Sequence, residues 1–404
     1  MTDATPHTLF PNPRAAGRGI PYGPRQQAVL NRDAFAAARD EISRWPGYAP
    51  TPLTALPGLA RDLGIAAVWY KDESGRFGLG SFKALGGAYA VFRLLAREVA
   101  AATGETVGAA DLAAGRYRDR VAGITVTCAT DGNHGRSVAW GARTFGCRCV
   151  IYIHETVSEG RRQAIAAYGA EVVRTPGNYD DSVRRAAEDA ERNGWFVVSD
   201  TSYEGYVDVP RDVMQGYAVM ADEAMAQLPP GVLPTHCFVQ AGVGGLAAAI
   251  CGHFWERWGA DRPRFVVVEP EKAACLFASA RAGRPTVFPG ALDTIMAGLA
   301  CGEVSLIAWQ VLETGADAFM TIPDAAAVAA MRALAAGTPP VVAGESGVGG
   351  LAGLMAAAAD PDARRRLGLD AGSRVILFGS EGDTDAALYA ELVGRPAAAV
   401  RGAA

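Results

Sequence analysis

The chain of 404 residues lacks the features that mark several classes of protein. No uninterrupted apolar run reaches the length of a membrane span, and the N-terminus has no basic region leading into an apolar one. No basic tract is interleaved with aromatic residues, and the formal net charge of −5 gives no field that would attract a polyanion. We therefore expect a soluble, cytoplasmic protein that binds neither a membrane nor nucleic acid.

Paired cysteine motifs are also lacking. The chain has seven cysteines, none of them in a C-x-x-C pair, and an odd number in a long chain is more typical of buried free thiols than of a disulfide framework or a metal site. Cys147 and Cys149 alternate within an apolar run, which favours a strand over a zinc knuckle. Cys275 and Cys301 could flank a loop and pair. No metal is expected.

Half of the residues are hydrophobic and only 20% are charged, so a substantial interior can be buried. The length exceeds one ordinary core. From about residue 66, short β-branched runs alternate with helical segments, which predicts an α/β fold with mostly parallel sheets and helices on both faces. The predicted strands are 66–71, 122–128, 147–153, 170–175, 195–199, 236–241, 264–270 and 373–379. The predicted helices include 81–101, 159–169, 179–194 and 245–259.

Other segments depart from this rhythm. The first 30 residues are rich in proline and glycine, which predicts an extended arm lying over another surface. Residues 104–120 look like an insertion. The alanine-rich stretches 325–336 and 354–366 are ordinary helix formers, and residues 395–404 are expected to fray.

The first motif with chemical potential is GSFKALGG, at residues 80–87. Gly80 and Ser81 are typical of a turn and an N-cap, so Lys83 is predicted in the first turn of a helix, where the helix dipole disfavours an ammonium. A lysine made partly neutral is a nucleophile that can bond covalently to an aldehyde cofactor. Taken alone, Lys83 is explained better as a solvated helix residue.

The second motif, QAGVGGLAAA, follows an apolar strand and opens a helix. Its glycines would let several backbone N–H groups converge on one anion, most naturally a phosphate. The pattern is not G-x-G-x-x-G, so a dinucleotide fits poorly. Tight packing of strand on helix is the alternative explanation. The predicted phosphate-binding residues are Gly242, Val243, Gly244, Gly245 and Leu246.

Two further turns carry polar groups. Asn133 and His134 follow a strand and begin a helix; an asparagine amide there can hydrogen-bond a phenolic oxygen, while His134 is expected mainly to support the loop. Ser380 ends a late strand, where it can point at a ring nitrogen. Asp383 or Asp385 is expected to cap the next helix.

In their order along the chain, these motifs resemble the tryptophan-synthase β-like, or fold type II, family of pyridoxal 5′-phosphate enzymes over roughly residues 50–390. KDESGRFGLGSFK resembles that family's K-x-E and S-F-K pattern, and residues 164–190 are similar to the small-domain helix-strand-helix of threonine dehydratases. One departure is Leu85, where the family usually has arginine. The resemblance implies pyridoxal 5′-phosphate as cofactor and a homodimer. It also implies a large PLP-binding domain of residues 1–85 and 208–404 and a small domain of residues 86–207.

The loop before the asparagine departs from the serine and threonine dehydratases, which usually have a neutral residue before the glycine. Here that residue is Asp131. A carboxylate in a cofactor pocket costs desolvation unless a cation is bound beside it or it handles a proton. The substrate is therefore expected to bring a positive charge.

This loop, together with residues 199–206 and 379–385, resembles the diaminopropionate ammonia-lyase branch of the family over almost the whole chain. The resemblance implies a lyase of amino-acid catabolism that converts D- and L-2,3-diaminopropionate to pyruvate and two ammonia. It assigns Lys83 as the base for the L form and Asp131 as the base for the D form. It places Asp200 near the end of the substrate that carries the second ammonium. The implied substrate-binding residues are Ser81, Thr130, Asp131, His134, Asp200 and Glu345.

Two alternatives stay open on the residues alone. A serine/threonine dehydratase-like β-eliminase of the same fold would carry the same lysine and glycine loop. A non-catalytic protein that binds a phosphate or nucleotide would use only the glycine loop. That second alternative leaves Lys83, Asn133 and Ser380 without a common role.

Overall fold

The computed structural model describes residues 6–402. Contacts divide the chain into two compact units, which we call the larger unit and the smaller unit. The larger unit is Met1–Arg32, Pro50–Gly80 and Met220–Ala404, and the smaller unit is Asp33–Ala49 and Ser81–Val219. Each unit has its own sheet and its own helices.

This division differs from the predicted domain boundaries in where it places three segments. Residues 33–49, 81–85 and 208–219 group with the smaller unit, although the sequence placed them in the large domain. For the first segment the physical reason is aromatic packing, because the Trp45 ring lies 5.5 Å from the Phe145 ring. Such a contact between distant segments leaves no signal in the pattern of either one.

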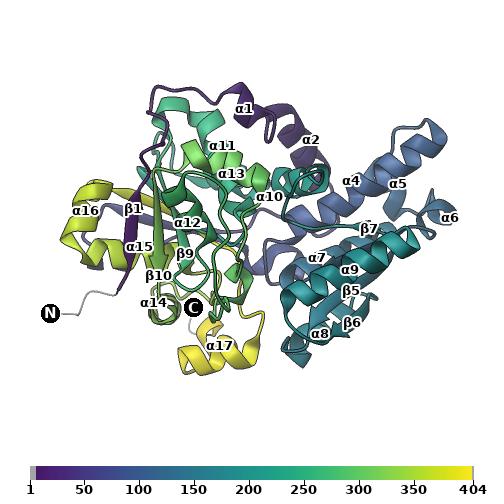
Figure 1. Ribbon diagram of the computed structural model, residues 1–404. Helices are drawn as coiled ribbons and strands as arrows, with labels where there is room; N and C mark the ends of the chain where they lie inside the picture. The colour runs from purple at the N-terminus through teal and green to yellow at the C-terminus, as the bar shows by residue number, and fades with distance from the viewer. Residues whose placement is uncertain (1–5, 403–404) are drawn as a thin grey trace. The chain divides into compact units, whose positions relative to one another are not determined.

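The larger unit is built on a seven-stranded sheet with the order β1-β10-β9-β8-β11-β3-β2. The inner strands are parallel, and the edge strands β1 and β2 are antiparallel to their neighbours. Strands β1, β10 and β9 of this sheet are labelled in Figure 1. The central strand β8 is buried along its whole length and its neighbour β9 is buried after its first residue, as expected for parallel strands covered on both faces. The strands are β1 (Thr8–Pro11), β2 (Leu53–Ala55), β3 (Ala67–Asp72), β8 (His236–Gln240), β9 (Arg264–Pro270), β10 (Ala318–Ile322) and β11 (Arg374–Gly379).

Helices cover both faces of this sheet. On one face, α15 approaches so closely that a Cβ at Gly353 would lie 2.6 Å from a methyl group of Val268. On the other face, Phe254 of α11 contacts Phe378, with ring centroids 6.1 Å apart. The helices are α1 (Pro24–Gln27), α3 (Pro57–Asp62), η1 (Glu73–Gly78), α11 (Gly245–Trp258), η2 (Gly259–Asp261), α12 (Cys275–Ala282), η3 (Ala297–Leu299), α13 (Leu306–Gly315), α14 (Asp324–Ala336), α15 (Gly349–Ala359), α16 (Pro361–Leu367), α17 (Ala386–Val393) and α18 (Ala397–Arg401).

The smaller unit has a four-stranded parallel sheet with the order β6-β5-β4-β7. Side chains alternate between its two faces. Val150 and Tyr152 pack with Ala186 of α9, which runs along β5 in Figure 1, whereas Ile151 lies against Gly135 of α7 on the opposite face. The strands are β4 (Thr125–Ala129), β5 (Arg148–His154), β6 (Glu171–Thr175) and β7 (Phe196–Val197). The helices are α2 (Arg32–Ile42), α4 (Ala84–Thr103), α5 (Ala109–Ala113), α6 (Arg118–Val121), α7 (Asn133–Phe145), α8 (Glu159–Ala166) and α9 (Tyr179–Asn193), and α10 (Asp208–Gln227) contributes to both units.

The α/β fold and all eight predicted strands are confirmed, and three strands were missed. β10 is a short apolar run between helices, a pattern that does not distinguish a strand from a helix. β1 and β2 are short edge strands, which are identified by the strands that they pair with and not by a sequence pattern of their own. The expected N-terminal arm includes β1, which pairs with β10.

The stretch 354–366 is helical as predicted, and it forms parts of two helices because Asp360 precedes a proline, has an extended backbone and caps α16. One prediction near the C-terminus was wrong in part. Residues 397–401 form α18, whose Val400 is fully buried, instead of fraying. Residues 403–404 lie outside the described residues.

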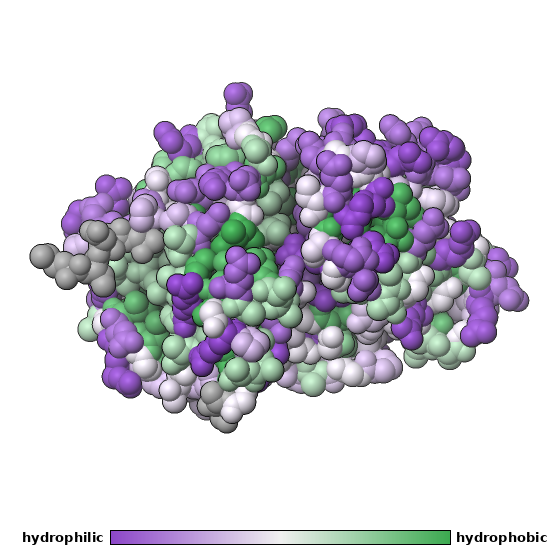
Figure 2. Space-filling model, turned by 90° about the horizontal axis from the view of Figure 1, so that it is seen from below, coloured by the Kyte–Doolittle hydropathy of each residue, from purple (hydrophilic) through white to green (hydrophobic). Residues whose placement is uncertain are grey.

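None of the helices formed by residues 6–402 combines the length and the apolar character that a membrane crossing requires. On the face drawn in Figure 2, hydrophobic residues form small areas separated by hydrophilic ones. The exposed large hydrophobic residues of the described chain are Ile20, Val183, Tyr203 and Val287.

The K-x-E part of the motif before Lys83 belongs to a buried charge network inside the larger unit. Lys71 Nζ donates to Glu223 at 2.7 Å, and Arg76 donates to both Glu223 and Glu73 at distances between 2.7 and 2.9 Å. Thr51 adds a hydroxyl donor to Glu73 at 2.5 Å. Two cations and two anions therefore balance, which is the condition for burying charges in a low-dielectric interior.

We expect Glu223→Gln to lower the free energy of unfolding by about 3–5 kcal/mol, because the change leaves Lys71 and Arg76 buried with one carboxylate between them. Urea unfolding measures the difference. Asp208→Asn removes an exposed carboxylate and serves as the control. A loss as small as that of the control would show that the network contributes little to stability.

Candidate active site

Lys83 stands at the N-terminal end of α4, although not in the first turn as predicted. Helix α4 begins at Ala84, and Lys83 holds the cap position, since its carbonyl accepts the first helical bond, from Gly87 N at 2.8 Å. Ser81, predicted as the N-cap, is buried in the turn that precedes the helix. The prediction of the N-cap was wrong by two residues because the turn after Gly80 continues through Lys83.

Close packing fixes the start of α4. A Cβ at Gly87 would lie 2.0 Å from the Ser137 hydroxyl of α7. A Cβ at Gly216 of α10 would lie 1.8 Å from the Leu85 carbonyl oxygen. Leu85 is itself fully buried, so the position where the resemblance led us to expect arginine serves as core in this chain. Lys83 therefore projects from a backbone held tightly on two sides.

The side chain of Lys83 pairs with a carboxylate. Its Nζ donates to Asp200 Oδ2 at 2.5 Å, and both side chains are 19% exposed. Burial alone would raise the pKa of Asp200, but the Lys83 ammonium outweighs it, with a smaller contribution from His134, and the pKa is lowered well below its usual range. Asp200 is therefore a carboxylate at neutral pH, and the nearest cation to it is Lys83.

His134 supports the loop around this pair. Its Nε2 lies 2.7 Å from the Val198 carbonyl oxygen, which can only accept, so Nε2 carries the proton. Burial lowers the pKa of His134, and the nearby Lys83 adds to this, while Asp200 opposes it. Nδ1 lies 3.8 Å from Asp200, beyond hydrogen-bond distance. Because a neutral His134 carries no charge, Lys83 is the group that balances the negative charge of Asp200.

The loop after β4 is organised by Thr130. Its hydroxyl oxygen accepts from the backbone N–H groups of Gly132 at 3.0 Å and Gly135 at 3.1 Å. A Cβ at Gly135 would lie 2.3 Å from the Thr130 methyl group, so that position has room for glycine alone. Asp131 follows directly, and its Oδ1 lies 2.7 Å from His154 Nε2. The Asp131 side chain is 28% exposed.

Asn133 begins α7, as predicted. Its Oδ1 accepts a bond from Arg136 at 2.6 Å. This bond fixes the orientation of the amide, so that its nitrogen, a donor, points away from Arg136.

The glycine loop lies in the larger unit, at the end of β8. Gly244 has a φ of +101°, a left-handed conformation that favours glycine, and α11 begins at Gly245. A Cβ at Gly242 would lie 3.0 Å from Cys301 Sγ, so the loop has no room there for a side chain. The N–H groups in the first turn of a helix have no partners within the helix and point outward, where they can receive an anion.

Ser380 lies in the same unit, just after β11, the neighbour of β8. Its Oγ accepts a bond from Gln240 Nε2 at 2.8 Å, and the same amide donates to the Phe378 carbonyl oxygen at 2.8 Å. Because the Gln240 amide donates to a lone pair of the Ser380 oxygen, the hydroxyl hydrogen of Ser380 can itself be donated to another acceptor. Asp385 caps α17 through a bond from Leu388 N, which confirms the capping prediction for one of the two aspartates.

Glu345 is buried in the turn before α15. That turn is tied to the segment after Ser380, since Ser346 N donates to Glu381 Oε1 at 3.0 Å and Gly344 N donates to the Glu381 carbonyl oxygen. Glu345 and Ser380 thus belong to two segments joined within the larger unit.

The predicted site residues therefore fall into two sets. Ser81, Lys83, Thr130, Asp131, Asn133, His134 and Asp200 are in the smaller unit, and the glycine loop, Glu345 and Ser380 are in the larger unit. Lys83, Asp200 and His134 form one cluster, while the Asp131 side chain pairs with His154 and not with that cluster.

Sequence reasoning missed Gln240 and His154. Gln240 is a polar residue in an apolar strand, and that break in pattern was the available signal. His154 ends a strand, and only the register of β5 with β4 shows which residue it meets.

The other candidate groups lie outside these sets. All seven cysteines are free thiols, Cys275 and Cys301 included. Residues 6–402 contain no group of three or more histidine, cysteine, aspartate or glutamate side chains arranged to hold a metal ion.

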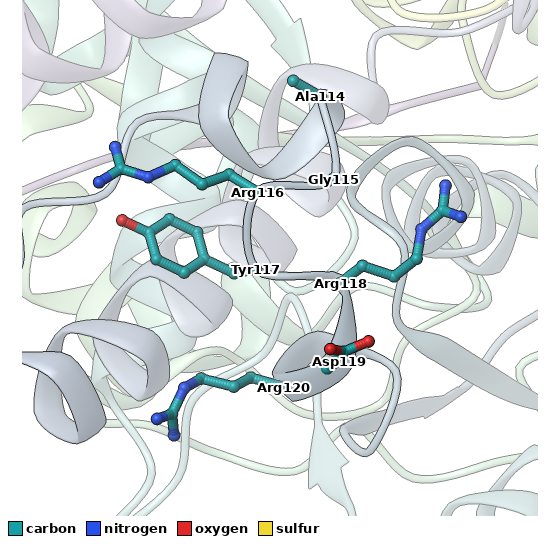
Figure 3. A pocket seen from close by; sticks show the side chains of 7 residues that line it. All are labelled: Ala114, Gly115, Arg116, Tyr117, Arg118, Asp119 and Arg120. Carbon is teal, nitrogen blue, oxygen red and sulfur yellow. The ribbon is translucent and has the colours of Figure 1, made fainter.

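The segment expected as an insertion holds a hollow of about 600 Å³ that is lined by residues 114–120. Figure 3 shows the side chains of these residues. Arg116, which lies beside Tyr117 there, is already paired with Glu105 at 2.6 Å. None of the predicted site residues lines this hollow, so we assign no catalytic role to it.

The chain is similar to known proteins over most of its length. The family model described as pyridoxal-phosphate dependent enzyme matches residues 44–381. The chain is 40% identical over 374 residues to the diaminopropionate ammonia-lyase of Escherichia coli, covering 90% of this chain and 92% of that protein. It is 41% identical over 359 residues to the diaminopropionate ammonia-lyase of Salmonella typhimurium, covering 86% and 89%.

A solved structure is similar over nearly the full length. It is the crystal structure of diaminopropionate ammonia lyase from Escherichia coli in complex with an aminoacrylate-PLP azomethine reaction intermediate. The TM-score is 0.85 and the sequence identity 37%, and the match covers 96% of this chain and 97% of that chain.

The Lys83–Asp200 pair predicts a pH dependence of stability. Because the pKa of Asp200 is lowered in the folded state, its contribution is present above about pH 4, the range of an unfolded aspartate, and is lost as the pH falls further. At pH 7 we expect Asp200→Asn to reduce the free energy of unfolding by about 1.5–3 kcal/mol. The difference from the parent chain should shrink below about pH 4.

Urea unfolding of the cofactor-free protein between pH 7 and pH 3 measures this effect. Asp208→Asn, which removes an exposed carboxylate, is the control. A difference that stays constant over the whole pH range would contradict the ion pair.

Proposed function

The chain belongs to the family of pyridoxal-phosphate dependent enzymes, and we propose that it is a diaminopropionate ammonia-lyase. The reaction is the α,β-elimination of 2,3-diaminopropionate to pyruvate and two molecules of ammonia. The enzyme is a carbon-nitrogen lyase with pyridoxal 5′-phosphate as its cofactor. We propose that it acts on both the D and the L form.

The observation that carries this proposal is the carboxylate of Asp200 beside Lys83. Once Lys83 is engaged by the cofactor, a largely buried anion needs another cation close to it. The second ammonium of 2,3-diaminopropionate supplies that cation. The hydroxyl group of serine or threonine does not.

The residues fit pyridoxal 5′-phosphate. The loop of Gly242, Val243, Gly244, Gly245 and Leu246, with its left-handed Gly244 at a helix start, is suited to a phosphate. The hydrogen of Ser380, left over by the bond from Gln240, can be donated to an unprotonated ring nitrogen. Asn133 is assigned to the phenolic oxygen. When bound, the cofactor supplies the electron sink for the α-carbanion.

The remaining chemistry belongs to side chains of this chain. We assign Nζ of Lys83 to remove the α-proton of the L form, and the carboxylate of Asp131 to remove it from the D form on the opposite face. Asp200 binds the β-ammonium and orients it. Since that group departs from an ammonium as neutral ammonia, it needs no added proton. The other substrate contacts are assigned to Ser81, Thr130, His134 and Glu345.

We also propose the wider setting of the enzyme. The larger unit, which carries the glycine loop, corresponds to the large cofactor-binding domain. The smaller unit, which carries Lys83, includes all residues of the predicted small domain. The active form is a homodimer in the cytoplasm that serves amino-acid catabolism. This part rests on the family resemblance.

The first test concerns the substrate. Purified holoenzyme given D- or L-diaminopropionate should release two molecules of ammonia for each pyruvate. Lys83→Ala should lose the visible absorbance of lysine-bound cofactor and slow elimination by about 10²–10⁴-fold, because the base for the L form and the covalent anchor are gone. Preference for serine, with one ammonia for each pyruvate, would identify a dehydratase instead.

The second test concerns the two bases. Asp131→Asn keeps the size of the side chain and removes its basicity. We expect kcat/KM for the D form to fall by about 10²–10⁴-fold, and the value for the L form to fall by less than about tenfold. Steady-state kinetics on both enantiomers measure this. Equal losses would refute the assignment of one base to each face.

A further inference from the structure

We propose that His154 is a positioning residue for Asp131 and that turnover of the D substrate depends on it. This inference rests on the proposed function, and it assigns a residue that neither the motifs nor the comparisons point to. His154 Nε2 lies 2.7 Å from Asp131 Oδ1, and on its other side Nδ1 lies 2.9 Å from the Thr156 hydroxyl.

The sheet itself brings the two residues together. β4 and β5 are parallel neighbours in which Ala129 pairs with Tyr152, and the next bond, from Thr130 N to the Tyr152 carbonyl oxygen, continues the ladder at 3.0 Å. Asp131 lies two positions beyond Ala129, and His154 lies two positions beyond Tyr152. Their meeting at the carboxyl ends of the strands is therefore set by register.

Hydrogen-bond chemistry fixes the direction of the bond between His154 and Asp131. A carboxylate only accepts, so Nε2 of His154 must carry a proton and donate it to Asp131. In the neutral imidazole, Nδ1 is then an acceptor, and the Thr156 hydroxyl donates to it. Thr156 thus stabilises the tautomer that Asp131 requires, and it does so from an exposed position.

The two oxygens of Asp131 are used differently. Oδ1 is anchored by His154, while within residues 6–402 no hydrogen bond reaches Oδ2. The backbone is held as well, since Arg161 donates to the Asp131 carbonyl oxygen at 3.4 Å. A base with one anchored oxygen and one available oxygen keeps a fixed direction for proton removal.

The groups that face the Asp131 carboxylate divide by role. His154 of β5 contacts the carboxylate and Arg161 of α8 contacts only the backbone carbonyl oxygen of Asp131, whereas the ion pair of Lys83 with Asp200 is a separate cluster. A change at His154 therefore acts on the base for the D form and leaves the base for the L form in place. Activity on the D form therefore tests Asp131 with His154, and activity on the L form tests Lys83 with Asp200.

The test uses holoenzyme and measures kcat and KM for D- and L-diaminopropionate. His154→Leu should lower kcat/KM for the D form by about 10–100-fold, mostly through kcat, because misplacement of a base slows proton removal more than binding. The value for the L form should stay within about twofold. The isotope effect of α-deuterated D substrate should increase, since proton removal becomes more rate-limiting.

Matched variants separate positioning from a general structural effect. His154→Gln places an amide donor near the site of Nε2 and should restore most of the activity on the D form. Thr156→Val should show a smaller loss on the D form alone. Glu155→Gln, at the exposed neighbouring residue, is the control and should change neither enantiomer.

The outcomes are distinguishable. An unmodified enzyme that releases no ammonia from either enantiomer refutes the proposed function. An active enzyme in which His154→Leu keeps the ratio of D to L activity, or loses both equally, refutes the role of His154 and leaves the proposed function standing. If His154→Leu does not fold, the D-selective loss in Thr156→Val decides, and its absence overturns the inference.

Discussion

The pairing of the Asp200 carboxylate with the Lys83 ammonium is the constraint on which the chemistry of this protein depends. The contact is 2.5 Å long and most of both side chains is shielded from water, so neither charge is stable there without the other. On the proposed function, such a site accepts a cation in exchange for the lysine. We therefore propose that the charge that stabilises the ligand-free protein also selects the substrate.

Parallel strands account for where the polar groups stand. In the smaller unit, Asp131 and His154 follow neighbouring strands. In the larger unit, the glycine loop and Ser380 follow neighbouring strands, and Gln240 joins them. Since parallel strands end at the same edge of a sheet, short polar turns after each of them gather there. The core behind the turns is apolar and tightly packed, which holds the polar groups in fixed positions.

Much of the fold could be predicted because the strands of a covered parallel sheet are continuous apolar runs. The same logic failed for β10, whose short apolar run lies between two helices, and for the edge strands β1 and β2, which exist only through their partners. Within the candidate site, the glycine turn at Gly244 was predictable because its conformation is local, whereas the N-cap at Lys83 was misplaced by two residues. The contact of His154 was not predictable, because its partner lies 23 positions away along the chain.

The sequence by itself determined the α/β class. It also identified Lys83, the glycine loop and the acidic loop as candidate site residues, because each is a local pattern with a local physical cause. Only the tertiary structure decided the pairings: Lys83 with Asp200, Asp131 with His154, and Ser380 with Gln240. Each pairing joins distant segments through the register of a sheet or the packing of a helix. Those distances are set when the whole chain folds, and no single segment encodes them.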